Sequence, residues 1–587
     1  MAESPSALVG AAIGVSAASL FIFGHPLANV PLSLLGENGG SGFNTRVWGF
    51  DGSRGEFSCL ATACIFGPLV VCGLLLLDAN ARLMAASALA IATLWYKYGM
   101  HASHPGGPRK HRILREPQWE DREFHVQRGW KCAVSEESHA LTEAAAASGL
   151  RLTGEPAGRQ TWHRSEAAGE EAASFNPNVN PNPNDSIWRA QCVAAWESQG
   201  GKVPDASWAP KDPIDALRKA MSWYQILQSD DGHWAGDYGG PHFLLPGLVI
   251  VWYVTGAQDD FLSPDQREAM ALYLRAHQQT DGGWGMHIES PSTMFGSCMC
   301  YMALRLLGTP ADDPAAVKGS TFIKSYGGGL RTGSWAKFYM CILGVMEWEA
   351  HNVIPAEMWL LPQWCPFHPA RLWCHCRMVY LPMGYLYGVK FVYTRAETDP
   401  VVQQLREELY CEPYSQIQWA GTADLVADID NYSPVHPLMK LANRALHLWE
   451  AYGGGLRRAL RDRGLTFVRD YMHAEDEQTN YVCIGPVNKV LNMLSTFHAS
   501  GCSTDSVSFK KHLLRVPDYL WLSEDGMKMQ GYNGSQGWDA SFTMQALAEA
   551  GLIEEFRKMS CRAYSYLERT QILSTPTSQA WPGVGRG

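Results

Sequence analysis

Two things are scarce in this sequence: positive charge, and the cysteine spacing of common metal and disulfide motifs. Lys and Arg together number 48 against 58 Asp and Glu, which gives a formal net charge of -10. A chain without a basic excess lacks the electrostatic footprint of a nucleic-acid-binding protein, so no nucleic-acid partner is expected. The 15 cysteines include no CxxC pair, which favours reduced thiols in a cytosolic environment over a disulfide framework.

A sustained alternation of apolar and polar residues is also missing, and apolar residues follow the helical period instead. Hydrophobic residues make up 46% and charged residues 18%, a globular composition in a chain long enough for two or more domains. The 22 Trp outnumber the 20 Phe. This unusual balance predicts either a structural repeat that contains Trp or a cavity lined with aromatic faces.

Residues 1–115 are predicted to be a membrane segment with one to three hydrophobic spans. Cys59–Leu77 carries no charge and would be about 28 Å long as a helix, enough to cross the hydrocarbon core of a bilayer. Ala7–Phe23 and Leu83–Tyr96 are weaker apolar candidates. The opening MAESPS lacks the basic start of a cleaved signal peptide. The Lys and Arg residues between 97 and 115 predict a cytosolic side there.

The remaining chain divides by composition into three parts. Residues 116–190 contain the Pro/Asn-rich stretch Ser165–Asp185, which predicts a loop or linker. Residues 191–573 form the predicted helical body, and residues 574–587 form a divergent tail.

A short pattern recurs in the helical body. "YQILQSDDGHW" (Tyr224–Trp234) and "YLRAHQQTDGGW" (Tyr273–Trp284) both place Gln at a helix end, followed by Asp-Gly-x-Trp, and "NGSQGWD" (Asn533–Asp539) is a degenerate third copy. Such self-similarity predicts stacked helical repeats. We expect the Gly to let the chain leave the helix, the Gln to bond backbone groups at a neighbouring helix end, and the Trp to cover the joint.

Six longer motifs closely resemble the oxidosqualene cyclases, over about Gly158 to Ile572. They are "GRQTW", "DGHWAGDYGGPHFLLPGLVI", "DGGWGMHIESPSTMFGS", "LWCHCRMVYLPMGYLYG", "YVCIGPVNKVLNML" and "DGMKMQGYNGSQGWD". The resemblance implies an all-α fold built from α/α barrels, the squalene cyclase-like toroid, with the second barrel incomplete here. It also implies attachment to the endoplasmic reticulum membrane, with the cyclase part cytosolic and lipid droplets as another location, and cyclisation of 2,3-oxidosqualene without metal or cofactor.

Nine side chains are assigned to the cyclisation cavity by this resemblance. Aromatic faces stabilise a carbocation by about 0.5–2 kcal/mol each and offer it neither a nucleophile nor water. By their place in the motifs, the residues that stabilise the cation or direct the product are Trp335, Trp373, Trp538, His375, Tyr380 and Tyr532, and those of the substrate channel and its constriction are Tyr238, Cys376 and Val379.

Tyr532 also bears on the product. In the family, lanosterol synthases usually carry Thr at this place of the "GYNGSQ" motif, and cycloartenol synthases carry Tyr. Tyr532 together with His375 therefore resembles the cycloartenol type, with lanosterol synthase as the alternative.

The acid that starts the reaction is missing from the sequence. The family protonates the epoxide with the Asp of a DCTAE motif, and no such motif occurs here. "VADIDNY" (Val426–Tyr432) superficially resembles the acid motif of squalene–hopene cyclases but lies in a region that matches a variable segment. The chain as written is therefore expected not to initiate cyclisation. Three readings remain: a clipped version of a working cyclase, a membrane-anchored triterpenoid-binding or scaffold protein, and a squalene–hopene cyclase.

A zinc site is the remaining alternative. "CPFHPARLWCHC" contains five residues of the types that zinc accepts: Cys365, His368, Cys374, His375 and Cys376. Their spacing is not that of a standard zinc finger, because adjacent Cys, His and Cys can hardly all face one tetrahedral ion. The resemblance places the same segment at the cavity without metal.

Overall fold

The structure is a computed structural model of the whole chain, and it describes residues 50–51, 56–57, 130–146, 150–152, 154–164, 185–205, 207–288, 290–365 and 367–573. The chain divides into two compact units, Met1–Arg109 and Lys110–Gly587. In the first unit the described residues are the antiparallel strands β1 (Phe50–Asp51) and β2 (Glu56–Phe57). The three predicted membrane spans lie outside the described residues. Within the described ranges, no helix combines the length and apolarity that crossing a bilayer requires.

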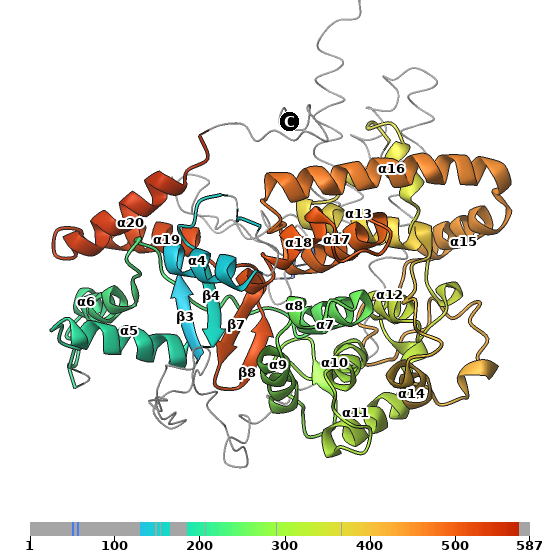
Figure 1. Cartoon of the computed structure of the whole chain (residues 1–587), viewed down its shortest axis with the longest axis horizontal. Coiled ribbons are helices and arrows are strands. Elements are labelled where there is room, and N and C mark those ends of the chain that lie inside the picture. Colours follow the sequence, from blue (N-terminus) through green and yellow to red (C-terminus); the bar gives the residue numbers. More distant parts are fainter. Residues whose placement is uncertain are drawn as a thin grey trace, which may run out of the picture. The chain divides into compact units, whose positions relative to one another are not determined.

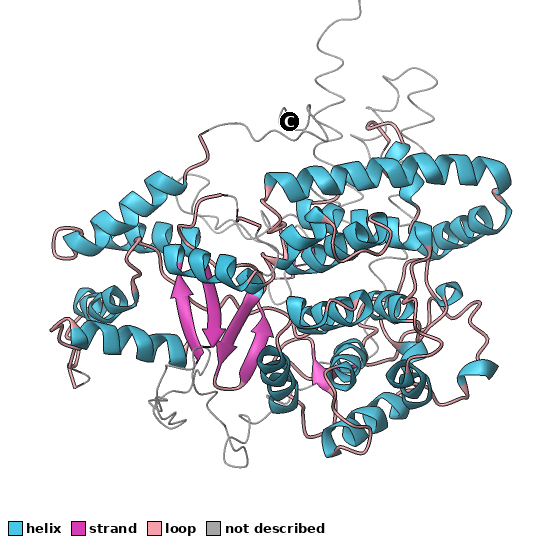
Figure 2. Cartoon of the chain, viewed as in Figure 1, coloured by secondary structure: helices cyan, strands magenta, loops and turns pink. Residues whose placement is uncertain are grey.

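The second unit is mostly helical, which confirms the predicted helical class (Figures 1 and 2). Its helices are α4 (Ser135–Ala145), α5 (Ser186–Ser198), α6 (Pro213–Tyr224), α7 (Leu244–Thr255), α8 (Gln258–Phe261), α9 (Pro264–Ala276), α10 (Met294–Leu306), α11 (Pro314–Ser325), α12 (Ser334–Leu343), α13 (Cys374–Val389), α14 (Pro400–Glu408), α15 (Pro437–Tyr452), α16 (Gly454–Gln478), α17 (Pro486–Ala499), α18 (Val507–Leu513), α19 (Gln536–Glu549) and α20 (Arg557–Thr570).

Helix α7 lies at the centre of the core. Every residue of α7 except Tyr253 is buried, as expected for a helix that is apolar on all sides. It packs against α10, α12 and α17, so segments far apart in the sequence meet around it. By contrast, α15 buries none of its residues and contacts α16.

Short strands interrupt the helices, and the apolar pattern did not predict them. They pair antiparallel as β3 (Trp130–Val134) with β4 (Gln160–Arg164), β5 (Trp284–Gly285) with β6 (Ser292–Thr293), and β7 (Leu520–Ser523) with β8 (Gly526–Met529). Figure 2 shows β3, β4, β7 and β8 side by side, and β4 contacts β7. Both strands of the β7–β8 hairpin are fully buried, so they lack the half-exposed alternation that identifies a strand in a sequence.

The two clear copies of the repeat have the same hydrogen bonds, as predicted. Gln228 Nε2 donates to the backbone oxygen of Met559, in α20, at 3.1 Å, and Gln278 Nε2 donates to that of Ala315, in α11, at 2.8 Å. The indole of Trp234 donates to Tyr224 O and that of Trp284 to Leu274 O, ten residues back in each case. Each copy therefore fastens one helix end to a neighbouring helix and seals the joint with a buried Trp.

Candidate active site

Helix α13 carries four of the nine predicted cavity residues in its first two turns, and Trp373 directly precedes it. Tyr238 lies in the loop before α7, and Tyr532 follows strand β8. Trp335 and Trp538 lie near the N-termini of α12 and α19.

The structure brings three of these residues together. The Tyr532 hydroxyl and His375 Nε2 share a hydrogen bond of 2.5 Å, and their rings meet edge to face with centroids 5.6 Å apart. The Tyr238 ring meets the Tyr532 ring in the same way at 5.1 Å. Burial raises the pKa of Tyr532, and the neighbouring Tyr238 adds to this effect, so the phenol keeps its proton.

Trp373 and Cys376 extend this group along α13. The Trp373 ring lies 4.6 Å from the His375 ring, centroid to centroid, and its indole N–H contacts Cys376 Sγ. The Trp373 side chain is nevertheless 64% exposed. Much of the indole surface beside His375 is therefore accessible to a ligand.

A second aromatic group includes Trp335 and Tyr380. The rings of Trp335 and Tyr380 are 6.5 Å apart and nearly perpendicular, and Trp335 also meets Phe243 of the pre-α7 loop at 6.0 Å. Val379, one position before Tyr380 on α13, is buried. Both aromatic groups therefore share α13.

Trp538 is the predicted residue that the described contacts leave apart. It stacks obliquely on Phe542, one turn later in α19, and is 65% exposed, whereas the repeat tryptophans Trp234 and Trp284 are 3% and 0% exposed. Gln536 keeps the repeat's function by donating to Gly158 O at 2.7 Å. The third copy thus retains its Gln contact without a buried Trp, and the cavity role of Trp538 stays a prediction.

Beneath Tyr238 and Tyr532 lies a buried ionic group that the motifs did not predict. Lys528 Nζ, from β8, pairs with the carboxylate of Asp237. Burial raises the pKa of Asp237 to about 6, against the lowering effect of Lys528. Asp525 accepts a 2.6 Å hydrogen bond from His277, which outweighs the effect of burial and lowers the pKa of Asp525 to about 2. Only the three-dimensional contact of β8 with the loop before α7 reveals this group.

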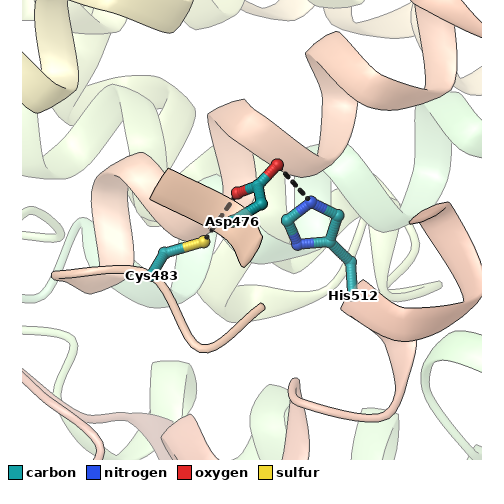
Figure 3. A group of neighbouring side chains, drawn as sticks. All are labelled: Asp476, Cys483 and His512. Atoms are coloured by element: carbon teal, nitrogen blue, oxygen red, sulfur yellow. Dashed lines mark hydrogen bonds and ion pairs between the residues drawn. The ribbon is translucent and has the colours of Figure 1, made fainter. Parts of the chain in front are cut away.

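In the Cys/His-rich segment, no three candidate ligand atoms of the described residues converge. Among the described residues, the one group of three candidate ligands whose atoms converge is Asp476, Cys483 and His512 (Figure 3). His368 instead accepts a hydrogen bond from Ala370 N in its own turn. The alternative of a zinc site in that segment therefore has no geometric support.

The three side chains of Figure 3 bond to one another. Asp476, near the end of α16, accepts from Cys483 Sγ at 3.4 Å and from His512 Nε2 at 3.2 Å. Lys489 Nζ lies 3.2 Å from His512 Nδ1 and donates to Tyr481 O at 2.6 Å. Because the buried ammonium already supplies the positive charge that Asp476 needs, a bound cation would meet electrostatic repulsion.

Two further features lie outside the candidate site. Asp430 of the "VADIDNY" segment accepts hydrogen bonds from Met294 N and Phe295 N at 2.8 and 2.7 Å, so it caps the N-terminus of α10. A surface groove of about 680 Å³, bordered by Trp252, Arg267 and Leu307 among others, contains none of the predicted site residues.

Comparisons with known proteins bear on the family of the chain. The family model described as the squalene-hopene cyclase N-terminal domain matches residues 217–525. A cycloartenol synthase of Dictyostelium discoideum is 45% identical over 362 residues, which cover 62% of this chain and 50% of the relative. A lanosterol synthase of Homo sapiens is 43% identical over 365 residues, covering 62% and 48%. An alpha-onocerin synthase of Lycopodium clavatum is 38% identical over 452 residues, covering 73% and 57%. The chain thus spans about half the length of the relatives it matches.

Proposed function

Because this chain belongs to the oxidosqualene cyclase family, we propose that it forms part of a site that cyclises (S)-2,3-oxidosqualene to a sterol precursor, with cycloartenol as the product. The reaction is an isomerisation, so it requires no redox cofactor. The site must fold an apolar polyene, stabilise a positive charge that moves along it and remove one proton at the end.

The contact between Tyr532 and His375 carries this proposal. A phenol and an imidazole joined by one hydrogen bond can accept a proton at a defined point, while the rings of Tyr238 and Trp373 beside them stabilise positive charge through their π faces. Tyr532 is also the residue that favours cycloartenol over lanosterol, and relatives of both activities match this chain about equally well.

The exposed tryptophans indicate that this aromatic wall needs a cover. Trp373 and Trp538 leave about two thirds of their surfaces exposed, and a cation cavity must exclude water. The 587 residues also contain no DCTAE motif. We therefore propose that this chain supplies the wall and the proton acceptor, and that a further segment, of the kind that makes up the unmatched half of the relatives, supplies the cover and the acid.

Membrane attachment is part of the proposal. The substrate is dissolved in membranes, and the segment before α13 exposes Trp364 and Phe367 by more than three quarters, a few residues before the exposed Trp373 in the sequence. Together with the predicted span Cys59–Leu77, these side chains favour attachment to the endoplasmic reticulum membrane, with lipid droplets as a second location.

A product assay tests the proposed function. The full chain would be expressed, together with a segment that carries the DCTAE motif from the unmatched half of a relative, in cells that lack their own oxidosqualene cyclase. The membranes would be supplied with (3S)-2,3-oxidosqualene, and the lipids identified by mass spectrometry against cycloartenol and lanosterol standards. Cycloartenol that disappears in a His375→Ala variant supports the proposal. Lanosterol alone would favour the lanosterol synthase alternative. Substrate that binds the membranes in a His375-dependent way without any product would favour a triterpenoid-binding protein.

A further inference from the structure

Strand β8 and the residue that follows it present two polar side chains to the loop before α7. Lys528 and Gln530 lie two residues apart, so they point to the same side of the extended chain, away from Met527 and Met529. Both are buried. Burying an ammonium and an amide is costly unless they are hydrogen-bonded or ion-paired. Their partners therefore indicate which segment these two side chains hold in place.

Those partners are consecutive residues of one segment. Lys528 pairs with the carboxylate of Asp237, and Gln530 Oε1 accepts the backbone N–H of Tyr238 at 2.9 Å. The next residue, Gly531, donates its N–H to Tyr238 O at 2.8 Å. Both backbone groups of Tyr238 are thus bonded to the residues directly before Tyr532.

The two segments approach each other closely, so a side chain at Gly531 would be a tight fit. A Cβ at Gly531 would lie 3.1 Å from Gly239 O and 3.1 Å from the Tyr238 ring. Gln530 N also donates to Tyr519 O at 2.8 Å, which connects this segment to the residue directly before β7. Tyr238 is therefore located against Gly531, and its ring meets the Tyr532 ring at 5.1 Å.

We propose that Gln530 and Lys528 are positioning residues that fix the Tyr238–Tyr532 ring pair, and through it the Tyr532–His375 proton acceptor, so that they determine which proton the cyclised cation loses. The final clause rests on the proposed function, whereas the positioning itself does not. Neighbouring carbons of a polycyclic skeleton are about 1.5 Å apart. A displacement of Tyr532 by about 1 Å is therefore enough to change which carbon it serves, and misplacements of that size change rates by about 100-fold.

The test measures the ring pair directly in the full chain without substrate. 3-Fluorotyrosine would be incorporated at position 532, and in a second sample at position 238, and the fluorine NMR resonances recorded in detergent for the parent protein and for Gln530→Met, which removes the acceptor for the Tyr238 N–H. The expected result is a displaced or split resonance at both positions. Gln530→Glu, which keeps an oxygen at the same place, should restore the parent resonances. Gln416→Met, at an exposed site, should leave them unchanged.

The outcomes separate positioning from function. If Gln530→Met leaves both resonances in place, the positioning proposal is wrong whatever the enzyme makes. If the variant fails to fold, Gln530→Asn, which withdraws the acceptor by one methylene, replaces it under the same criterion. In the product assay, a parent protein that makes cycloartenol should release additional products in Gln530→Met. Displaced resonances with an unchanged product mixture would overturn the role in proton choice, whereas a parent that makes no triterpene contradicts the proposed function alone.

Discussion

The buried cluster of Figure 3 makes a sharp prediction for Lys489→Met. Lys489, on α17 beside this cluster, is fully buried, and its ammonium donates to Tyr481 O at 2.6 Å and His512 O at 3.0 Å. Around it, burial and the adjacent Asp476 raise the pKa of Glu475, while His512 holds the pKa of Asp476 low against the effect of burial. The cluster therefore contains a buried carboxylate whose charge depends on Lys489 and His512.

The magnitude follows from the loss of one partner of a buried charge group. Leaving a carboxylate uncompensated costs about 3–5 kcal/mol. Residues 480–483 are strained, because Asn480, Tyr481 and Cys483 have positive φ angles of 50°, 63° and 67°. The hydrogen bond from Lys489 to Tyr481 O helps to keep this segment in place. If α17 and α18 open together, a loss of about 3–5 kcal/mol in their opening free energy makes their protected amides exchange faster by about two to three and a half orders of magnitude.

Hydrogen-exchange mass spectrometry of the full chain measures this. Peptides from α17 and α18 should exchange faster in Lys489→Met, and Lys318→Met, which removes an exposed lysine on α11, should exchange as the parent does. The double variant Asp476→Asn/Lys489→Met should lose less opening free energy than the two single variants lose together, because it removes both charges. Exchange of α17 within tenfold of the parent in Lys489→Met would refute the electrostatic account of this cluster.

Three other predictions follow from the candidate site and its supports. In a cycloartenol-forming protein, Tyr532→Thr should shift part of the product toward lanosterol or related triterpenes by mass spectrometry, and an unchanged mixture would contradict the role of Tyr532. Gln278→Ala should lower the free energy of unfolding by about 1–3 kcal/mol, because it leaves the Ala315 and Gly282 carbonyls without their donor, while Gln416→Ala should change it little in chemical denaturation. Asp237 binds its proton more tightly in the folded state, where its pKa is about 6, than in the unfolded state, where it is 3.8. Its contribution to the free energy of unfolding is therefore greatest below pH 4 and falls by about 3 kcal/mol as the pH rises through 6. In Asp237→Asn this part of the pH dependence should vanish from denaturation midpoints measured between pH 4 and 7, and a slope equal to the parent's would show that Asp237 does not titrate there.

The repeat joints could be predicted from the sequence because their chemistry is local. Each needs a Gln, a Gly and a Trp within a few residues, and Gln278 and Trp284 make the contacts expected of them. The contact of Tyr532 with His375 joins residues 157 positions apart. Residue pattern alone does not predict it, and only the family resemblance placed the two residues in one cavity.

The parts that escaped prediction have a common physical reason. The β7–β8 hairpin is buried on both faces, so its residues show no alternation. The Asp476 cluster combines residues of α16, the following loop, α17 and α18 whose types are ordinary in isolation. In both cases the deciding quantity is burial, which depends on how distant segments pack. The exposure of Trp538 is similar, since its degenerate copy of the repeat still pairs a Gln with a Trp but does not reveal that this Trp stays exposed.

The most direct test of the proposed cation site is whether its aromatic wall prefers a positive charge. Equilibrium binding to the full chain in detergent would be measured for a tertiary-amine analogue of oxidosqualene and for squalene, its uncharged counterpart, with the parent protein and with Trp373→Leu. The amine should bind more tightly than squalene to the parent. The exposed site of Trp373 should let the variant fold, and the loss of one aromatic face, about 0.5–2 kcal/mol, should weaken amine binding by about 2- to 30-fold and leave squalene binding less affected. Equal affinities for the two ligands, or amine binding that is indifferent to Trp373, would contradict a cation-stabilising site on this chain.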